Sequence, residues 1–285
     1  DHSVRRQTEH LVDADNPERR GALTVGFLGS EGSYSHQAAT RHFGARQTPV
    51  VLRAGRSFAA LIEDVTAGRT DYAVLPIENT TAGSINQVYD LLVSHDVALI
   101  GEEVQRVDHC LIGLEPVDIS RIRRVYSHPQ ALTQCSEFLA DLSDVRVESV
   151  SDTASGVLRV REEQDLSTAA IASAAAAALY ELPVLARDIA NQRENYTRFV
   201  VVSRHEVRYD ARIPCKTSLV FATSHAEGAL AKALEVLARH GLNLTKLESR
   251  PKPGEPWKYR FFVDFEGNMA SPEVASALEA LGAHT

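Results

Sequence analysis

Short apolar runs alternate with amphipathic stretches along most of the chain, and polar loops separate the two. The mostly apolar run Leu23 to Leu28 predicts a buried strand, and the spacing over 36–43 predicts a helix after it. The same order recurs, with strands expected at 71–77, 124–126, 145–150 and 169–172 and helices at 85–94, 129–142, 154–162 and 173–180. Strands that alternate with helices in this way predict an α/β fold with mostly parallel sheets.

A second pattern follows a polar stretch at 206–214. Strands are expected at 216–223, 243–248 and 259–266, and helices at 228–240 and 271–281. This β-α-β-β-α order is most of a ferredoxin-like βαββαβ unit, and its last strand is missing because the chain stops at Thr285. The chain is therefore divided into a tail or linker (1–22), a first domain (23–205), a linker (206–214) and a second domain (215–285).

Length and composition are those of a globular protein with two domains, since the chain has 285 residues of which 44% are hydrophobic. The net charge of -8 argues against nucleic acid or an anionic membrane as a partner. No apolar run reaches the length of a membrane span, and the first residues are not a signal peptide. The 3 cysteines are widely spaced, which favours reduced thiols in the cytoplasm over disulfides or a zinc site.

Hydroxyl and amide side chains gather where the expected strands end and the expected helices begin. In such folds these ends meet at one crevice, where helix N-termini point free N–H groups at a ligand. Taken singly, each residue is more simply interpreted as a helix cap. Together they predict a site for a carboxylate, formed by Ser33, Ser35, Asn79, Thr80, Thr81, Ser84, Ser127, Ser151 and Thr153.

The stretch 191–204 combines a polar segment with a β-branched run. Residues 199–203 predict a buried strand, and Asn195, Thr197 and Arg198 are expected at its mouth, where side chains can face a ligand. An ordinary polar loop is the alternative, because Asn, Glu and Arg are common turn residues.

Six motifs in this order make the chain resemble the bacterial prephenate dehydratases that carry a C-terminal ACT regulatory domain. The resemblance covers residues 23–281, and the pairing of Thr-Arg-Phe with Glu-Ser-Arg-Pro is its most specific part. The motifs lie at 29–35 (GSEGSYS), 75–80 (LPIENT), 127–131 (SHPQA), 195–199 (NYTRF), 228–230 (GAL) and 248–251 (ESRP). Two loops depart from the family pattern: Ser30 stands where proline is common, and 81–84 lacks the acidic residue that many members have before the glycine.

The resemblance implies a dehydratase domain of two α/β lobes, like those of periplasmic binding proteins, with the site in the cleft between them. Lobe 1 is expected at about 23–102 and 188–205, and lobe 2 at about 103–187. Thr197 is implied as the main catalytic residue, together with Arg198, Glu78 and Asn79. The implied substrate-binding residues are Ser33, Thr80, Thr81, Ser84, Ser127, His128, Gln130, Gln134, Ser151, Thr153, Asn195 and Phe199.

The family's reaction converts prephenate to phenylpyruvate, carbon dioxide and water, and no metal or organic cofactor is expected. The resemblance also implies phenylalanine as an allosteric effector of the ACT domain and a homo-oligomer, either dimer or tetramer. The effector residues implied are Gly228, Ala229, Leu230, Asn243, Leu244, Glu248, Ser249, Arg250 and Pro251. Some members carry a chorismate mutase domain ahead of this region, for which residues 1–22 are too short. The alternative is a two-lobed sensor of amino acids or carboxylates without catalysis.

Overall fold

The structure is a computed structural model, and it describes residues 21–207, 209–210, 212–224, 226–252 and 254–282. Two compact units divide between Glu206 and Val207. Nearly all of the expected tail, 1–22, and the last residues of the chain, 283–285, lie outside the described residues. No helix in the described ranges is long and apolar enough to cross a membrane.

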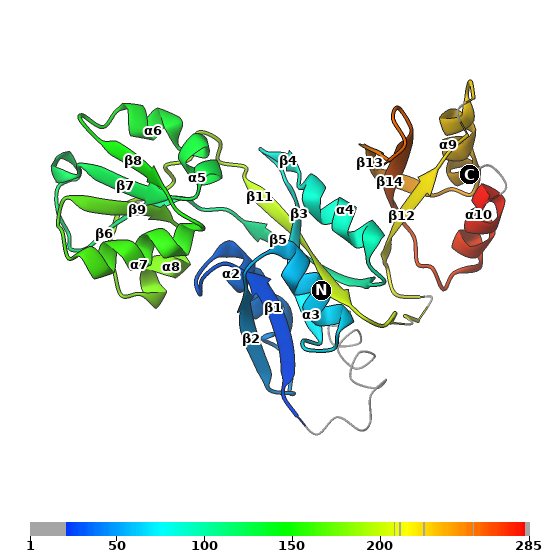
Figure 1. Cartoon of the computed structure of the whole chain (residues 1–285), viewed down its shortest axis with the longest axis horizontal. Coiled ribbons are helices and arrows are strands. Elements are labelled where there is room, and N and C mark those ends of the chain that lie inside the picture. Colours follow the sequence, from blue (N-terminus) through cyan, green and yellow to red (C-terminus); the bar gives the residue numbers. More distant parts are fainter. Residues whose placement is uncertain (1–20, 208, 211, 225, 253, 283–285) are drawn as a thin grey trace. The chain divides into compact units, whose positions relative to one another are not determined.

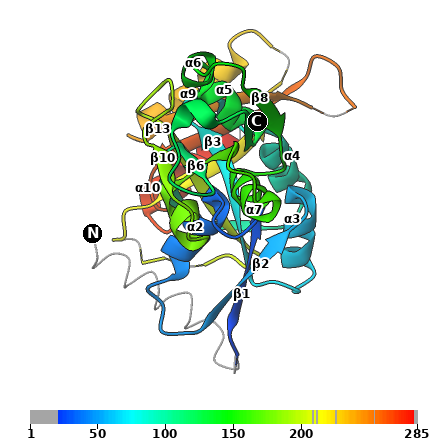
Figure 2. The ribbon, with the colours of Figure 1, turned by 90° about the vertical axis from the view of Figure 1, so that its left-hand side faces the viewer.

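Lobe 1 of the first unit is built on a sheet with the strand order β2-β1-β3-β11-β5, to which β4 is added beside β3 (Figure 1). Its helix α2 packs against β1, β3 and β5, whereas α3 and α4 pack against each other and against β3 (Figure 2). The strands are β1 (Leu23–Leu28), β2 (Val50–Gly55), β3 (Tyr72–Asn79), β4 (Gly83–Ser84), β5 (Ala98–Arg106) and β11 (Tyr196–Ser203). The helices are α2 (Tyr34–Phe43), α3 (Phe58–Thr66) and α4 (Asn86–Ser94).

Lobe 2 is built on a sheet with the strand order β10-β6-β9-β7-β8. Its strands are β6 (Cys110–Gly113), β7 (Arg124–Ser127), β8 (Arg146–Ser149), β9 (Thr168–Ala172) and β10 (Val184–Ala186). Its helices are η1 (Ile119–Arg121), α5 (Pro129–Gln134), α6 (Ser136–Ala140), α7 (Thr153–Glu163) and α8 (Ala174–Leu179).

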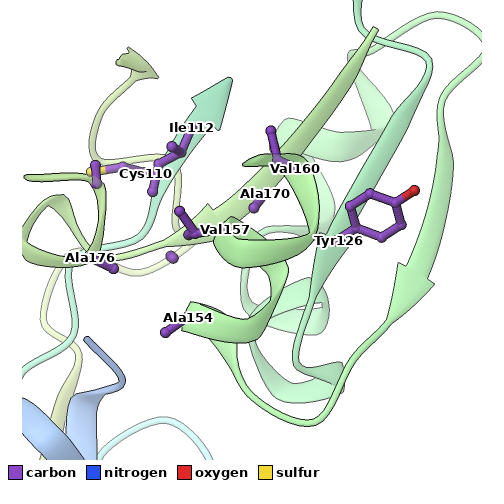
Figure 3. Close-up of a cluster of buried hydrophobic side chains, with 10 residues drawn as sticks. Cys110, Ile112, Tyr126, Ala154, Val157, Val160, Ala170 and Ala176 are labelled. Carbon is purple, nitrogen blue, oxygen red and sulfur yellow. The ribbon is translucent and has the colours of Figure 1, made fainter. Parts of the chain in front are cut away.

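Alternation along β9 divides the core of lobe 2 between the two faces of its sheet. Ala170 and Ala172 pack with α7 and α8, a cluster that Figure 3 shows around Val157. Ala169 and Ile171 pack instead with the residues of α5 and α6. The five residues of β9 are all buried, as expected for a strand covered on both faces.

Several sequence-based expectations need correction. The sheets are mixed, because β11 runs antiparallel to β3 and β5, and β6 runs antiparallel to β9. In each sheet the antiparallel strand is the one by which the chain enters that lobe from the other, β6 in lobe 2 and β11 in lobe 1. The first crossing follows Arg106, since β5 continues past the expected lobe boundary at 102. The helix expected over 129–142 is two helices, because the backbone leaves helical geometry at Cys135 (φ -114°, ψ 20°).

The second unit contains a sheet of three strands in the described residues, in the order β12-β14-β13. Its elements are β12 (Lys216–Ala222), α9 (Ala229–Arg239), β13 (Asn243–Pro251), β14 (Tyr259–Glu266) and α10 (Pro272–Gly282). Inward residues of the sheet, among them Val263 and Phe265, pack against Ala233 and Leu237 of α9 and Ala277 of α10. This is the ferredoxin-like arrangement that the sequence predicts.

Candidate active site

Asn79 occupies the centre of a hydrogen-bond network where the two lobes meet. It ends β3, and its Oδ1 accepts from the backbone N–H groups of Thr81 and Ala82 at 3.0 and 2.9 Å. Its Nδ2 donates to the backbone carbonyl oxygen of Tyr196 at 3.1 Å. Backbone N–H groups only donate and carbonyl oxygens only accept, so these three contacts fix which end of the amide is oxygen.

Thr197 lies directly opposite Asn79 in the pairing of β3 with β11. The Asn79 Nδ2 lies 2.8 Å from Asn195 Oδ1 and 3.0 Å from Thr197 Oγ1, so its two hydrogens are shared among these oxygens and the Tyr196 carbonyl oxygen. Because Asn79 is the donor, the hydrogen of the Thr197 hydroxyl is not used in this bond. In the part of the chain that the structure describes, that hydrogen has no acceptor within hydrogen-bond distance, so the hydroxyl is available to donate to a ligand.

Gln134 brings lobe 2 into the network from the end of α5. Its Nε2 donates to Thr81 Oγ1 at 2.5 Å and to Asn79 Oδ1 at 3.3 Å, and its Oε1 accepts from Asn195 Nδ2 at 3.1 Å. The orientation of the Gln134 amide follows from that of Asn79, whose Oδ1 is an acceptor. The structure thus brings together Asn79, Thr81, Gln134, Asn195 and Thr197, all of which are site residues expected from the sequence.

His109 and Tyr34 extend the network and were not among the expected site residues. His109 lies between β5 and β6 and is 2% exposed, and its Nε2 is 2.8 Å from Gln134 Oε1, so Nε2 carries the hydrogen. The Tyr34 hydroxyl lies 3.3 Å from His109 Nδ1 and 3.1 Å from the carbonyl oxygen of Asp108. Burial lowers the pKa of His109 and raises the pKa of Tyr34, so both rings are neutral.

Arg198 and Glu78 lie on the opposite face of the sheet from the Thr197 and Asn79 side chains, because successive side chains of a strand alternate. The Nε of Arg198 donates to Glu102 Oε2 at 2.6 Å, and its Nη1 lies 3.8 Å from Glu78 Oε2. The two expected catalytic residues are therefore close to each other and not to the Thr197 hydroxyl. A further correction is that Thr197 and Arg198 belong to β11 itself, which begins at Tyr196, and do not precede it.

Three further expected residues contribute to the local structure. The Thr80 hydroxyl accepts from the backbone N–H of Tyr196 at 2.9 Å and so links the loop after β3 to β11. Ser84 pairs with Glu78 in the short β3–β4 hairpin. The Phe199 side chain is 1% exposed and lies in the core.

Two of the expected serines use their hydroxyls within the fold. Ser33 caps α2, since its Oγ accepts from the backbone N–H of His36 at 3.3 Å. The Oγ of Ser127 donates to the backbone carbonyl oxygen of Ile171 at 2.6 Å and is fully buried. For these two residues the simpler interpretation, a structural hydroxyl, describes the contacts that the structure shows.

The starts of α5 and α7 hold the remaining expected residues of lobe 2. His128 caps α5 through its Nδ1, which accepts from the backbone N–H of Gln130 at 3.2 Å, and burial lowers its pKa. Thr153 is the first residue of α7 and Ser151 precedes its cap, which is Asp152. These helix starts supply backbone N–H groups, which favour negative charge nearby.

Ser30 and Asp152 connect the lobes at a second place. Both the backbone N–H and the Oγ of Ser30 donate to Asp152 Oδ2, at 3.1 and 3.0 Å. The other carboxylate oxygen of Asp152 accepts from the backbone N–H of Ser155 at 2.9 Å and so caps α7. Serine at position 30, where proline is common in the family, thus provides two donors, whereas proline has no N–H.

Two more hydrogen bonds join the lobes beside Ser30. Gln37 Nε2 on α2 donates to Ser173 Oγ, the cap of α8, at 2.8 Å. The hydroxyl of Tyr180 donates to the carbonyl oxygen of Glu31 at 2.6 Å. These contacts hold the loop after β1 against lobe 2. Only the fold shows them, because the paired residues lie far apart in the sequence.

The expected effector residues of the second unit lie at both ends of its sheet. Gly228 precedes α9 with φ +73°, a backbone conformation that favours glycine. Arg250 and Pro251 end β13 beside Arg260 and Tyr259, at the end of the sheet where Ala222 closes β12. Asn243 and Leu244 begin β13 at the opposite end of the sheet. Within one chain, the nine expected residues therefore do not form a single cluster.

The fold and the network define a two-lobed α/β protein of the periplasmic-binding-protein-like class with a ferredoxin-like unit after it. The family model "Prephenate dehydratase" matches residues 25–207, and the model "ACT domain" matches 227–283. The chain is 43% identical to the bifunctional chorismate mutase/prephenate dehydratase of Escherichia coli K12, over 90% of this chain and 67% of the relative.

Solved structures have the same fold. A prephenate dehydratase from Arthrobacter aurescens in complex with L-Phe has a TM-score of 0.81 and 30% identity, with 92% of this chain and 86% of that chain covered. A protein described as GqqA, a novel type of quorum quenching acylase, has a TM-score of 0.78 and 33% identity, with 92% and 93% covered.

The chain therefore belongs to the prephenate dehydratase family and carries an ACT domain. Its activity is that of a lyase in aromatic amino acid biosynthesis.

Proposed function

We propose that this chain dehydrates and decarboxylates prephenate to phenylpyruvate at the lobe junction around Thr197. The observation that carries the proposal is the bond from Asn79 Nδ2 to Thr197 Oγ1, because it leaves the threonine hydrogen free to donate. Prephenate has a ring hydroxyl that must leave as water. A positioned donor stabilises the negative charge that develops on that oxygen.

The reaction balances without a cofactor. The C–O bond to the ring hydroxyl breaks, and the oxygen takes up a proton that comes from solvent to leave as water. The C–C bond to the ring carboxylate breaks as well, and its electron pair completes the aromatic ring while carbon dioxide departs. Threonine is a weak acid, so Thr197 acts by hydrogen bonding within the Asn79 network and not by full proton transfer. Among the described residues, no cluster of three or more His, Cys, Asp or Glu could hold a metal ion.

The two carboxylates of prephenate need donors with little added charge. Arg198 is already occupied by Glu102 and Glu78 on the other face of the sheet. The proposed contacts are therefore the positive dipole ends of α5 and α7 on the lobe 2 side, beside the N–H groups that His128 and Asp152 cap. Thr197 and Asn79 are therefore assigned to the leaving hydroxyl, and the lobe 2 helix starts to a carboxylate. A carboxylate that is less solvated there than in water loses carbon dioxide more readily.

Regulation is assigned to the ACT domain. Phenylalanine is the proposed effector, in keeping with the complex of the A. aurescens relative, and the protein is proposed to be a cytoplasmic homo-oligomer, a dimer or a tetramer. Gly228 and the end of β13 are the proposed effector contacts.

The test is turnover of prephenate by the purified chain, followed as phenylpyruvate formation, with and without phenylalanine. The proposal expects turnover that falls as phenylalanine is added. A protein that binds phenylalanine in calorimetry but leaves prephenate unchanged would support the alternative, a sensor without catalysis. Turnover that does not respond to bound phenylalanine would contradict the regulatory assignment alone.

A further inference from the structure

A continuous series of hydrogen-bonding contacts ends at Thr197, and each contact from His109 onward has a defined direction. The series draws on both lobes and on the segment that links them. It runs from Tyr34 on α2 to His109 between β5 and β6, then to Gln134 on α5, to Asn79 on β3 and finally to Thr197 on β11.

The backbone determines the direction of the series from His109 to Thr197. Two backbone N–H groups and one carbonyl oxygen fix the Asn79 amide, and this requires Gln134 to donate through Nε2 to Asn79 Oδ1. The Gln134 Oε1 must then face His109, whose Nε2 must be the donor at 2.8 Å. The ring is neutral, so its Nδ1 has no hydrogen, and the single hydrogen of the Tyr34 hydroxyl is shared between Nδ1 at 3.3 Å and the carbonyl oxygen of Asp108 at 3.1 Å.

We propose that His109 and Tyr34 are positioning residues for the dehydratase reaction. His109 holds Gln134 through Nε2–H, Gln134 holds Asn79, and Asn79 keeps the Thr197 hydroxyl as a donor toward the substrate. Tyr34 favours the tautomer of His109 with the hydrogen on Nε2, because its hydroxyl can donate to an Nδ1 that has no hydrogen. The proposal rests on the proposed function, since it assigns both residues a part in that reaction.

The position of His109 in the fold explains why this residue can have such a role. It is 2% exposed in the first crossing between the lobes, so it can contact α2 of lobe 1 and α5 of lobe 2 at once. Bonds of this kind reinforce one another when they point the same way in a buried site. What the site needs from residue 109 is a donor at the Nε2 position and not merely the volume of a ring.

Two substitutions separate the donor from the volume. In His109→Gln an amide N–H reaches the place of Nε2–H, whereas His109→Met fills similar space without a donor. The proposal expects kcat of His109→Met to fall about tenfold or more while KM changes less than about threefold, as for a group that acts in the transition state. It expects His109→Gln to retain kcat within about threefold of the wild type.

Tyr34→Phe tests the next bond, and Tyr126→Phe is its matched control. Tyr126 is also a buried tyrosine of this unit, but its hydroxyl donates to Glu163 at 2.7 Å, outside the network. The proposal expects kcat to fall about threefold in Tyr34→Phe and to stay at the wild-type value in Tyr126→Phe. Equal rates in the two phenylalanine variants would contradict the role of Tyr34.

NMR of protein with ¹⁵N-labelled histidine reads the hydrogen on His109 without substrate. The signal that His109→Gln removes is expected to show a protonated Nε2 and a bare Nδ1. A hydrogen on Nδ1, or equal kcat for folded Gln and Met variants of an active enzyme, would overturn the proposal. If His109→Met does not fold, the proposal is tested by the NMR spectrum and by kcat of Tyr34→Phe and Tyr126→Phe. Absence of turnover by the wild type would instead refute the proposed function.

Discussion

Ser30 offers a selective way to weaken the contact between the lobes. Both of its donors meet one oxygen of Asp152, while the other oxygen caps α7 through Ser155. A change at Asp152 would therefore disturb a helix as well as the contact between the lobes. Ser30→Ala removes only the hydroxyl bond, and Ser30→Pro removes both bonds.

The magnitude follows from the bonds that are lost. A hydrogen bond to a charged group contributes about 1.5 to 3 kcal/mol to stability. Because Ser30 and Asp152 are partly exposed, we take about 1 kcal/mol for each of their two hydrogen bonds. Since 1.4 kcal/mol corresponds to about a tenfold change in an equilibrium constant, Ser30→Ala should shift the equilibrium between joined and separated lobes by about fivefold and Ser30→Pro by about thirtyfold. The apparent affinity for a ligand falls with the fraction of the competent state, so KM should rise by up to these factors.

Steady-state kinetics with prephenate measures this effect, because kcat should change little once the lobes have come together around the substrate. Ser57→Ala is the matched control: Ser57 caps α3 in the same lobe by accepting from the backbone N–H of Ala60 at 3.1 Å. That variant should lose some thermal stability at an unchanged KM. If KM stayed at the wild-type value in both Ser30 variants, the contact would have no part in substrate binding.

Three further outcomes are expected. Asn79→Asp turns the donor facing Thr197 into an acceptor, so kcat should fall about a hundredfold. Adding Thr197→Val to this variant should lower kcat little further. Additive losses in the double-mutant cycle would contradict the coupling between Asn79 and Thr197. Burial lowers the pKa of His109, so the unfolded state binds more protons, and the free energy of unfolding should fall as pH drops below about 6.5. Urea unfolding of His109→Gln should show a shallower fall of this free energy with pH. The same dependence on pH in both proteins would be inconsistent with a buried neutral ring. Burial raises the pKa of Cys135 to about 12, so a thiol reagent at neutral pH should modify Cys215 first, and equal rates would contradict the burial.

Local pattern was sufficient for much of the fold. The apolar run of β1 and the alternation along β14 predicted those strands, and the α/β order with a ferredoxin-like unit followed from the sequence of elements. The mixture of parallel and antiparallel strands could not be predicted from local pattern, because the direction of β11 depends on the return crossing between the lobes. The helix break at Cys135 was also missed, since neither Gly nor Pro marks it.

The candidate site was predictable only in part. Asn79, Gln134 and Thr197 could be proposed from motifs, but their grouping depends on the long-range pairing of β3 with β11 and on the contact between the lobes. Residues 34 and 109 are 75 apart in sequence, and nothing local to His109 distinguishes it from a histidine that simply fills the core. Tyr34 lies within the GSEGSYS motif, which was the one available signal for it.

The proposed reaction depends most on donation by the Thr197 hydroxyl to the departing group of prephenate. The direct measurement is kcat for prephenate in Thr197→Val, which has the same shape without the hydroxyl, beside Thr197→Ser, which keeps it. We expect kcat to fall about a hundredfold or more for valine, with the folded state retained, and to recover to within about tenfold of the wild type for serine. A folded valine variant with near-normal kcat would show that the Thr197 hydroxyl does not donate to the departing group.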